Sequence, residues 1–512
     1  MLKKVFGSSV FGVEATTITV EVNVDSGIGY HLVGLPDNAI KESNFRIAAA
    51  LQNNGYKIPG KKIIINMSPA DLRKEGSAYD LTLAIGILVA TKQIIAEHLE
   101  DYLIMGELSL DGNLQPIKGA LPIAVKAKEE GFKGFILPKQ NAKEAAIVDG
   151  LEIYGVENIK EVIAHFDKNI LIPQTIINTK EEFYKNLEFP EFDFSDVKGQ
   201  ESIKRCMEIA AAGGHNIILI GPPGAGKTML AKRLPSILPP MTLDEALETT
   251  KIHSVVGRVK AHTGIMAQRP FRSPHHTISN VALVGGGSYP QPGEISLSHN
   301  GVLFLDELPE FKREVLEVMR QPLEDREVTI SRAKFTVTYP SSFMLVASMN
   351  PSPGGYFNDP NAPVTSSPAE MQRYLSKVSG PLLDRIDIHI EVTPVPFEKL
   401  SDDRKGESSV TIRNRVTKAR ELQTIRFKDS EHVHYNAQMN TKQIRSYCKL
   451  DKASMDLLKA AMEQLNLSAR AYDRILKVSR TIADLEASES ITGTHISEAI
   501  QYRSMDREGW LG

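Results

Sequence analysis

The stretch HNIILIGPPGAGKTMLAKRL, residues 215–234, decides the fold of this chain. It begins with an apolar run that predicts a buried strand and ends in a predicted helix. Between them the pattern G-x-x-x-x-G-K-[ST] is filled by Gly221, Gly226, Lys227 and Thr228. Glycines let backbone N–H groups curl around phosphate oxygens, and a helix N-terminus favours an anion. The stretch therefore predicts a P-loop in an α/β domain, and the alternative is a glycine-rich turn that binds nothing.

The residues of this P-loop have separate expected roles. Lys227 is expected to reach the β and γ oxygens of a nucleotide, and the Thr228 hydroxyl is expected to bind Mg²⁺. ATP and Mg²⁺ are therefore the expected cofactors. The loop that cradles the phosphates is expected to comprise Gly221, Pro222, Pro223, Gly224, Ala225 and Gly226.

Two further apolar runs end in polar residues. GVLFLDELPEF, residues 301–311, predicts a buried strand followed by Asp306, which would hold Mg²⁺, and Glu307, which would polarise the attacking water. Without a P-loop, such a run is more typical of a strand that enters a solvated loop. SSFMLVASMNP, residues 341–351, ends another strand at Asn350, which would hydrogen-bond the same water or the γ-phosphate. The alternative for Asn350 is a turn residue before Pro351.

Longer stretches around these motifs resemble a known family. They are DVKGQESIKR (196–205), FRSPHHTISNVALVGGG (271–287), PGEISLSHNGVLFLDELPEF (292–311) and SGPLLDRIDIHIE (379–391). Over nearly its whole length the chain resembles the magnesium-chelatase-like AAA+ ATPases of the ComM and YifB type. The resemblance implies an α/β fold: an AAA+ P-loop core with a helical lid, preceded by an α/β domain related to Lon protease and ribosomal protein S5. It also implies a homo-hexameric ring with ATP at the subunit interfaces.

The resemblance assigns further residues. Asp196 to Gln200 match the segment that contacts adenine, and Arg385 matches the arginine finger that reaches a neighbouring subunit's ATP. A local salt bridge with a neighbouring aspartate is the alternative for Arg385. Arg470 matches the second sensor of the lid, with Arg474 as the second choice.

Element patterns divide the chain into expected domains. Residues 1–166 alternate strand and helix patterns, with a strand in ATTITVEVNV from Ala15, a helix over 37–55 and a hairpin in GELSLDGNLQPIKG, residues 106–119. Residues 167–190 have weak periodicity and are expected to be a linker. Residues 191–396 are expected to form the ATPase core and residues 397–512 the helical lid.

The expected N-terminal domain departs from Lon-type peptidases, which use a Ser-Lys dyad. Ala78 stands at the nucleophile position and Leu121 at the lysine position, and the nearest residues of the required types are Ser77 and Lys118. Because covalent catalysis requires a nucleophile and a base within hydrogen-bond reach, peptidase activity is not expected. The domain is interpreted as a scaffold or interaction module.

Metal-ligand patterns are also missing. Relatives commonly read Asn-Pro-Cys-Pro-Cys-Gly after the first sensor, but this chain has Ser352 and Gly354 at the cysteine positions, so no structural zinc is expected. The adjacent His275 and His276 are the nearest remaining metal candidates, although adjacent side chains point different ways on a regular element.

Composition limits the possible partners. The 512 residues carry a net charge of -3, so a nucleic acid would have to bind a local patch. The longest apolar run, LTLAIGILVAT from Leu81, has about half of the ~20 residues that a membrane span requires. We expect a cytoplasmic protein with no membrane partner.

One local basic patch falls between the two sensor-bearing strands. The stretch REVTISRAKF, residues 326–335, alternates like a hairpin strand and carries Arg326, Arg332 and Lys334. The helicase branch of AAA+ proteins inserts a hairpin into the ring's pore at this place, so the resemblance favours a DNA motor that promotes branch migration in recombination or natural transformation. The alternative for the hairpin is an edge ribbon protected by charge. The alternatives for the function are an ATPase subunit that drives metal insertion and a protein-remodelling factor.

Overall fold

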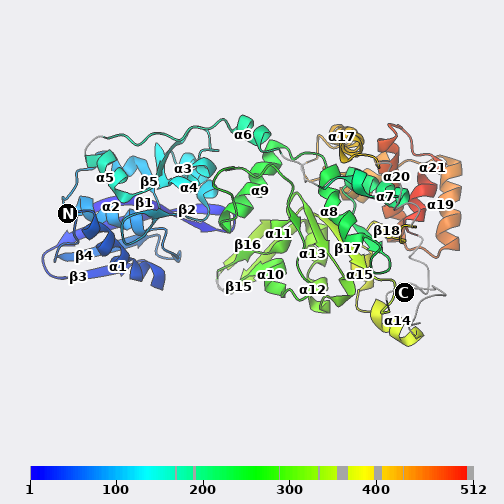
Figure 1. Ribbon diagram of the computed structural model, residues 1–512, viewed down its shortest axis with the longest axis horizontal. Helices are drawn as coiled ribbons and strands as arrows, with labels where there is room; N and C mark the ends of the chain where they lie inside the picture. Colours follow the sequence, from blue (N-terminus) through cyan, green and yellow to red (C-terminus); the bar gives the residue numbers. More distant parts are fainter. Residues whose placement is uncertain are drawn as a thin grey trace. The chain divides into compact units, whose positions relative to one another are not determined.

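The structure is a computed structural model that describes residues 2–167, 170–187, 192–287, 289–332, 335–354, 367–396, 406–430 and 432–503. The chain forms two compact units (Figure 1). The first comprises Met1–Leu187 and Thr242–Ala267, and the second Glu188–Met241 and Gln268–Gly512. Within the described residues, no helix has the length and apolar character needed to cross a membrane.

The first unit is built on a seven-stranded mixed sheet with the strand order β3-β4-β2-β1-β5-β8-β9. The predicted strand from Ala15 is confirmed as β2, whose buried positions alternate as its β-branched pattern requires. The strands are β1 (Leu2–Phe11), β2 (Glu14–Asp25), β3 (Gly29–Val33), β4 (Lys62–Ser68), β5 (Tyr102–Ile104), β8 (Gly134–Pro138) and β9 (Glu152–Val156). The predicted hairpin at 106–119 is present as β6 (Glu107–Leu108) and β7 (Leu114–Gln115).

Helices cover this sheet. The predicted helix over 37–55 is α1, and its N-cap residue Asp37 accepts a hydrogen bond from the backbone of Ile40. Every residue of α2 is buried, which explains the apolar run from Leu81 without a membrane. The helices of this unit are α1 (Asn38–Asn53), α2 (Asp80–Ala90), α3 (Ala120–Glu129), α4 (Lys139–Ala145), α5 (Ile159–Asp167), α6 (Thr179–Lys185) and α9 (Leu243–Val255).

The second unit is built on a five-stranded parallel sheet with the order β11-β14-β17-β10-β18. Strands β10, β14 and β17 are fully buried, which their continuous apolar runs predict for a parallel sheet covered on both faces. The strands are β10 (Ile217–Ile220), β11 (Phe271–Arg272), β14 (Val302–Leu305), β17 (Met344–Met349) and β18 (Ile388–Glu391).

Helices of the second unit pack on this sheet and on each other. Contacts join α7 to β18, α8 to β17, and both helices to α17. The helices are α7 (Glu201–Gly213), α8 (Lys227–Ile237), α10 (Asn280–Val284), α11 (Glu294–Leu297), α12 (Arg313–Glu317), α13 (Arg320–Asp325), α14 (Pro368–Leu375) and α15 (Gly380–Leu383). The C-terminal helices are α17 (Ser409–Arg426), α18 (Thr441–Tyr447), α19 (Lys452–Gln464), α20 (Ala469–Leu485) and α21 (Gly493–Gln501).

Two antiparallel ribbons project from this unit's connections. The predicted hairpin in REVTISRAKF is confirmed as β15 (Glu327–Arg332) paired with β16 (Phe335–Pro340). A second, shorter ribbon pairs β12 (Gly285–Gly286) with β13 (Gln291–Pro292). Only Arg326 separates the end of α13 at Asp325 from β15, and α13 contacts this strand, so the hairpin is anchored to the helical layer at its base.

Candidate functional site

The predicted order of strand, loop and helix is confirmed around residues 221–226. Strand β10 ends at Ile220, and α8 begins at Lys227. A Cβ atom on Gly221 would lie 2.1 Å from the carbonyl oxygen of Val392, so no other residue fits there. Gly224 and Gly226 have φ angles of 78° and 90°, which glycine adopts without the steric cost of a side chain.

Lys227 lies folded across this loop. Its Nζ donates to the carbonyl oxygens of Gly221 at 2.6 Å and Pro222 at 3.0 Å, and to Oδ1 of Asn350 at 3.1 Å. Burial lowers the pKa of Lys227, while the charges of Asp306 and Glu307 oppose that shift. The ammonium group is therefore held at the mouth of the loop by neutral acceptors, which a phosphate oxygen can replace.

Asp306 follows β14 and faces the start of α8. Its Oδ2 accepts a hydrogen bond of 2.7 Å from the Thr228 hydroxyl, and its Oδ1 accepts one from the Ser348 hydroxyl. The structure thus brings together the two residues expected to hold Mg²⁺, Thr228 and Asp306. Hydroxyl and carboxylate oxygens are ligands that Mg²⁺ accepts.

Ser348 is a site residue that the sequence interpretation missed. It lies on β17, and the pairing of Leu305 with Ala347 sets Ser348 beside Asp306. Its Oγ also accepts a hydrogen bond of 3.3 Å from the backbone N–H of Glu307. Its position two residues before Asn350 was the one feature of the sequence that could have identified Ser348 as a site residue. A serine inside an apolar strand does not by itself indicate a contact with a ligand.

Glu307 stands at the open side of the site. Its side chain is 57% exposed, and its Oε2 lies 3.8 Å from Nδ1 of His276. Its φ angle of 55° is in the left-handed region, a conformation that non-glycine residues adopt rarely and often at functional sites. His276, a metal candidate in the sequence, is therefore a neighbour of the expected catalytic carboxylate. Among the residues described, no group of three or more His, Cys, Asp or Glu is placed to hold a metal ion.

The residues fit a nucleotide with Mg²⁺. A loop that requires glycine at three positions, an ammonium group held by replaceable carbonyls, and a hydroxyl next to a carboxylate are the donor set that a triphosphate and its metal require. These groups converge where β10, β14 and β17 end. Ligands bind at this carboxyl edge in open parallel sheets.

The segment expected to contact adenine touches the same loop. Gln200 donates from Nε2 to the carbonyl oxygens of Ala225 at 3.0 Å and Thr393 at 3.2 Å. Asp196 instead forms an ion pair of 3.3 Å with Arg233 on α8. Gln200 therefore links the P-loop to the strand-end segment after β18.

Arg385 lies at the opposite, amino edge of the sheet, before β18. Its guanidinium pairs with Glu324 of α13 and donates to the carbonyl oxygen of Pro381 at 2.6 Å. The side chain is only 12% exposed. From the sequence, the alternative for Arg385 was a salt bridge with a neighbouring aspartate, Asp384 or Asp387. In the structure its ion-pair partner is instead Glu324.

Arg470 and Arg474 lie near Arg385, not near the P-loop. Arg470 is 68% exposed and pairs with Asp384 at 2.7 Å. Arg474 is 23% exposed and pairs with the buried Asp387 at 2.7 Å. The arginine assigned to the second sensor thus shares the amino edge of the sheet with the arginine assigned to the finger.

The residues expected to contact DNA separate into two groups. Arg326 lies at the base of β15, where its guanidinium donates to the carbonyl oxygen of His432 and burial lowers its pKa. Arg332 lies exposed at the end of β15 opposite Phe335. Lys334 lies outside the described residues. Among these three, Arg332 is the described residue whose side chain is exposed to solvent.

The dyad positions of the first unit do not form a nucleophile and base pair. The Ser77 hydroxyl donates to Oε2 of Glu107, a carboxylate rather than a lysine. Ala78 packs against the apolar core of the unit, and Leu121 is buried within α3. In the loop expected to lack zinc ligands, Ser352 is buried, and residues 355–366 lie outside the described part of the chain.

Comparisons with known proteins show the family of this chain. Residues 193–400 match the family described as magnesium chelatase, subunit ChlI; residues 20–141 match subunit ChlI of Mg-chelatase; and residues 406–503 match the subunit ChlI C-terminal family. The chain is 44% identical to competence protein ComM of Haemophilus influenzae over 506 residues, 98% of this chain and 97% of that protein. It is 44% identical to YifB of Escherichia coli over 498 residues, 97% of this chain and 96% of that protein.

A partial likeness extends to a peptidase. Lon protease 2 of Bacillus subtilis is 30% identical over 157 residues, which cover 28% of this chain and 27% of that protein. The parallel sheet and P-loop define an AAA+ P-loop protein. Within that class the chain belongs to the magnesium-chelatase-like family that includes ComM and YifB.

Proposed function

We propose that this protein is a ring-forming ATPase that acts on DNA. The observation that carries the ATPase activity is the convergence of Lys227, Thr228, Asp306, Glu307 and Asn350 at the carboxyl ends of neighbouring parallel strands. The match of residues 193–400 to the family described as magnesium chelatase, subunit ChlI, supports the use of ATP and Mg²⁺.

The chain's own residues divide the work of hydrolysis. When bound, Mg²⁺ neutralises charge on the phosphates. Lys227 would exchange its contacts with the Gly221 and Pro222 carbonyls for phosphate oxygens, and Thr228 and Asp306 would hold the metal. Glu307, which is exposed at the mouth of the site, accepts the proton of the attacking water, and Asn350 orients that water or the γ-phosphate.

A second copy of the chain completes this site. Arg385 and Arg470 lie at the amino edge of the sheet, whereas the P-loop lies at the carboxyl edge of the same sheet. One subunit cannot bring both edges to one nucleotide, so both arginines act on the ATP of a neighbour. This arrangement favours a closed ring, for which we propose a homo-hexamer with the C-terminal helices as its lid.

DNA is the proposed substrate because the β15–β16 hairpin presents an exposed arginine. Arg332, with Lys334 two residues further along the sequence, would contact phosphates without regard to base sequence. A motor that moves along any DNA requires contacts of this kind. The first unit, whose Ser77 pairs with a carboxylate, is proposed as a Lon/S5-like interaction module without peptidase activity.

A second candidate follows from the family match over residues 193–400. Magnesium chelatase, subunit ChlI, is the description of that family, so an ATPase subunit that drives metal insertion is the alternative. Such a subunit would require separate partners for the metal and the porphyrin. ATP turnover should then respond to those partners and not to DNA.

One assay separates these functions. ATP turnover is measured alone and with single-stranded, double-stranded and branched DNA, with Lys227→Ala as the inactive control. We expect turnover in the wild type, loss in Lys227→Ala and stimulation by branched DNA. Stimulation only by chelatase partner subunits would favour the alternative, casein cleavage would favour a peptidase, and no turnover under any condition would contradict an ATPase.

A further inference from the structure

Two adjacent residues, His215 and Asn216, join the start of the P-loop strand to the segment that carries Arg385. They directly precede β10, the strand that ends in the phosphate loop. The Asn216 side chain donates from Nδ2 to the carbonyl oxygen of Arg385 at 3.0 Å and accepts from the backbone N–H of Leu345 at 2.8 Å. The Asn216 carbonyl accepts from the N–H groups of Asp387 and Ile388 at 3.0 and 3.1 Å.

His215 fixes the same segment from its other side. It is fully buried, with Nδ1 3.0 Å from Oδ2 of Asp387 and Nε2 2.8 Å from the hydroxyl oxygen of Thr481 on α20. Burial alone would raise the pKa of Asp387, but the charge of Arg474 and the hydrogen bond from His215 hold it well below its usual value. Asp387 is therefore an ionised acceptor, buried between a histidine and an arginine.

These contacts determine how the His215 ring is protonated. Burial lowers the pKa of His215 although Asp387 opposes the shift, so the ring is neutral near pH 7 and carries one N–H. Because ionised Asp387 can only accept, the proton lies on Nδ1, and Nε2 accepts from the Thr481 hydroxyl. The Thr481 hydroxyl has one proton and two acceptors within reach, Nε2 of His215 at 2.8 Å and the Lys477 carbonyl oxygen at 3.0 Å. Donation to Nε2 avoids two lone pairs facing each other at the shorter of these distances.

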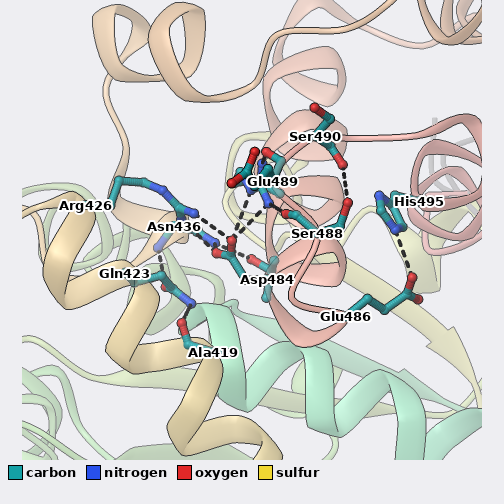
Figure 2. Close-up of polar contacts among 12 residues, drawn as sticks. Ala419, Gln423, Arg426, Asn436, Asp484, Glu486, Ser488, Glu489, Ser490 and His495 are labelled. Atoms are coloured by element: carbon teal, nitrogen blue, oxygen red, sulfur yellow. Dashed lines mark hydrogen bonds and ion pairs between the residues drawn. The ribbon is translucent and has the colours of Figure 1, made fainter.

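The chain of hydrogen bonds continues into the C-terminal helices. Asn436 donates from Nδ2 to Thr481 at 3.1 Å and to Asp484 at 2.7 Å. Figure 2 shows Asn436 and Arg426 converging on Asp484. Every step from Asp484 to Asp387 thus joins buried groups, and the series ends two residues from Arg385.

We propose that His215 and Asn216 are positioning residues for Arg385. They hold the backbone of the Arg385 segment at a fixed place relative to β10. Arg385, which one subunit presents to its neighbour, therefore keeps a fixed position relative to the phosphate loop of its own subunit. Neither residue touches nucleotide. This inference rests on the proposed ATPase and on the action of Arg385 on a neighbouring copy.

Asn216→Asp tests the proposal in a double-mutant cycle with Arg385→Ala. The aspartate keeps an acceptor for Leu345 N–H but sets a carboxylate oxygen against the carbonyl oxygen of Arg385. Since small misplacements of a catalytic group cost one to two orders of magnitude in rate, we expect kcat to fall about 10-fold with an unchanged affinity for a fluorescent ATP analogue. In the Arg385→Ala background the same substitution should have no further effect on kcat.

A purely structural role predicts a different result. In that case Asn216→Asp would lower kcat by the same factor in both backgrounds, or would weaken ATP binding, and either outcome overturns the proposal. Asn440→Ala is the matched control: it removes an asparagine side chain that caps α18, away from Arg385, and should leave kcat unchanged.

Other outcomes distinguish the proposal from its premise. If the wild type hydrolyses ATP and Arg385→Ala retains full activity, the finger assignment fails, and the positioning role fails with it. If the wild type does not hydrolyse ATP, the proposed function itself is contradicted. If Asn216→Asp does not fold, Thr481→Val, which removes the hydroxyl that contacts both His215 and Asn436, enters the same cycle with the same expected non-additivity.

Discussion

The two edges of the parallel sheet in the second unit contrast in chemistry. At the carboxyl edge, the charged groups face an open site: Glu307 is 57% exposed, and the bonds of Lys227 go to neutral acceptors. At the amino edge, the charged groups are paired: Arg470 and Asp384 form an exposed pair, and Asp387 is 1% exposed between His215 and Arg474. The open edge has groups whose bonds can change during a reaction, whereas the bonds of the buried Asp387 hold the segment that carries Arg385.

This difference separates binding from positioning. A buried ion pair is weak evidence for net stability, but the removal of one partner leaves an uncompensated charge at high cost. Such pairs therefore fix geometry more than they add free energy. Substitutions at the carboxyl edge should change the chemistry of ATP and leave folding intact, whereas substitutions in the network beyond the amino edge should change the fold.

Among the substitutions that test this comparison, Glu307→Gln should have the largest effect, a loss of kcat for ATP. The amide keeps the shape of the side chain but cannot accept a proton, so kcat for ATP should fall about 10³-fold while ATP affinity is retained. Single-turnover kinetics and binding of a fluorescent ATP analogue measure the two quantities separately. Glu310→Gln, three residues away in a surface pair with Lys377, is the control and should keep wild-type turnover. Normal turnover in Glu307→Gln would remove the assignment of the base.

The carboxyl edge could be predicted from the sequence because its residues lie in short motifs. Fixed spacing identified Lys227 and Thr228, and an apolar run ending in two acids identified Asp306 and Glu307; the structure brings all four to one edge of the sheet. The mixed α/β architecture and the β15–β16 hairpin also followed from periodicity and turn signals.

The amino edge could not be predicted in the same way. His215 and Asn216 lie at the start of the P-loop stretch. The side-chain partners of His215, Asp387 and Thr481, are 172 and 266 residues from it in the chain. No local pattern reports which distant carboxylate meets a histidine. Ser348 was missed for the related reason that its role depends on the register of β14 against β17.

Asp484→Asn tests whether the buried network behind the amino edge fixes the fold. Asp484 accepts from Arg426 at 2.6 Å and from Arg480 at 3.1 Å, and its side chain is 1% exposed. Asp484→Asn removes the counter-charge that the two guanidiniums share and leaves them their bonds to neutral acceptors, so we expect a loss of about 3 kcal/mol in local stability. Hydrogen exchange of the α20 amides measures this loss.

The control for this substitution is a surface pair in the same group of helices. Glu463→Gln breaks an exposed contact of 4.0 Å with Lys459, and exposed pairs contribute less than about 1 kcal/mol. If Asp484→Asn and Glu463→Gln change α20 exchange equally, the network does not fix the fold. If the α20 amides stay protected from exchange in both variants, the two edges differ only in how exposed their charged groups are.

The smallest effect is expected at the hairpin, which belongs to neither edge. Arg332→Ala combined with Lys334→Ala removes two cations from the proposed DNA-binding surface. Each cation that no longer neutralises a phosphate should lower the slope of log affinity against log salt by about one, so the affinity falls most at low salt and equally for all sequences. Basal ATP turnover without DNA should stay at the wild-type level, because none of the groups that form the nucleotide site comes from the described residues of the hairpin.

Fluorescence anisotropy of labelled DNA at several salt concentrations measures this slope. Arg373→Ala combined with Lys449→Ala removes the same charge from exposed positions elsewhere in the second unit and serves as the control. An equal decrease of the slope in both double variants would mean that DNA responds to the overall charge of the unit. A decrease confined to the hairpin variant would instead assign DNA binding to a third region, separate from the groups that hydrolyse ATP and from those that position Arg385.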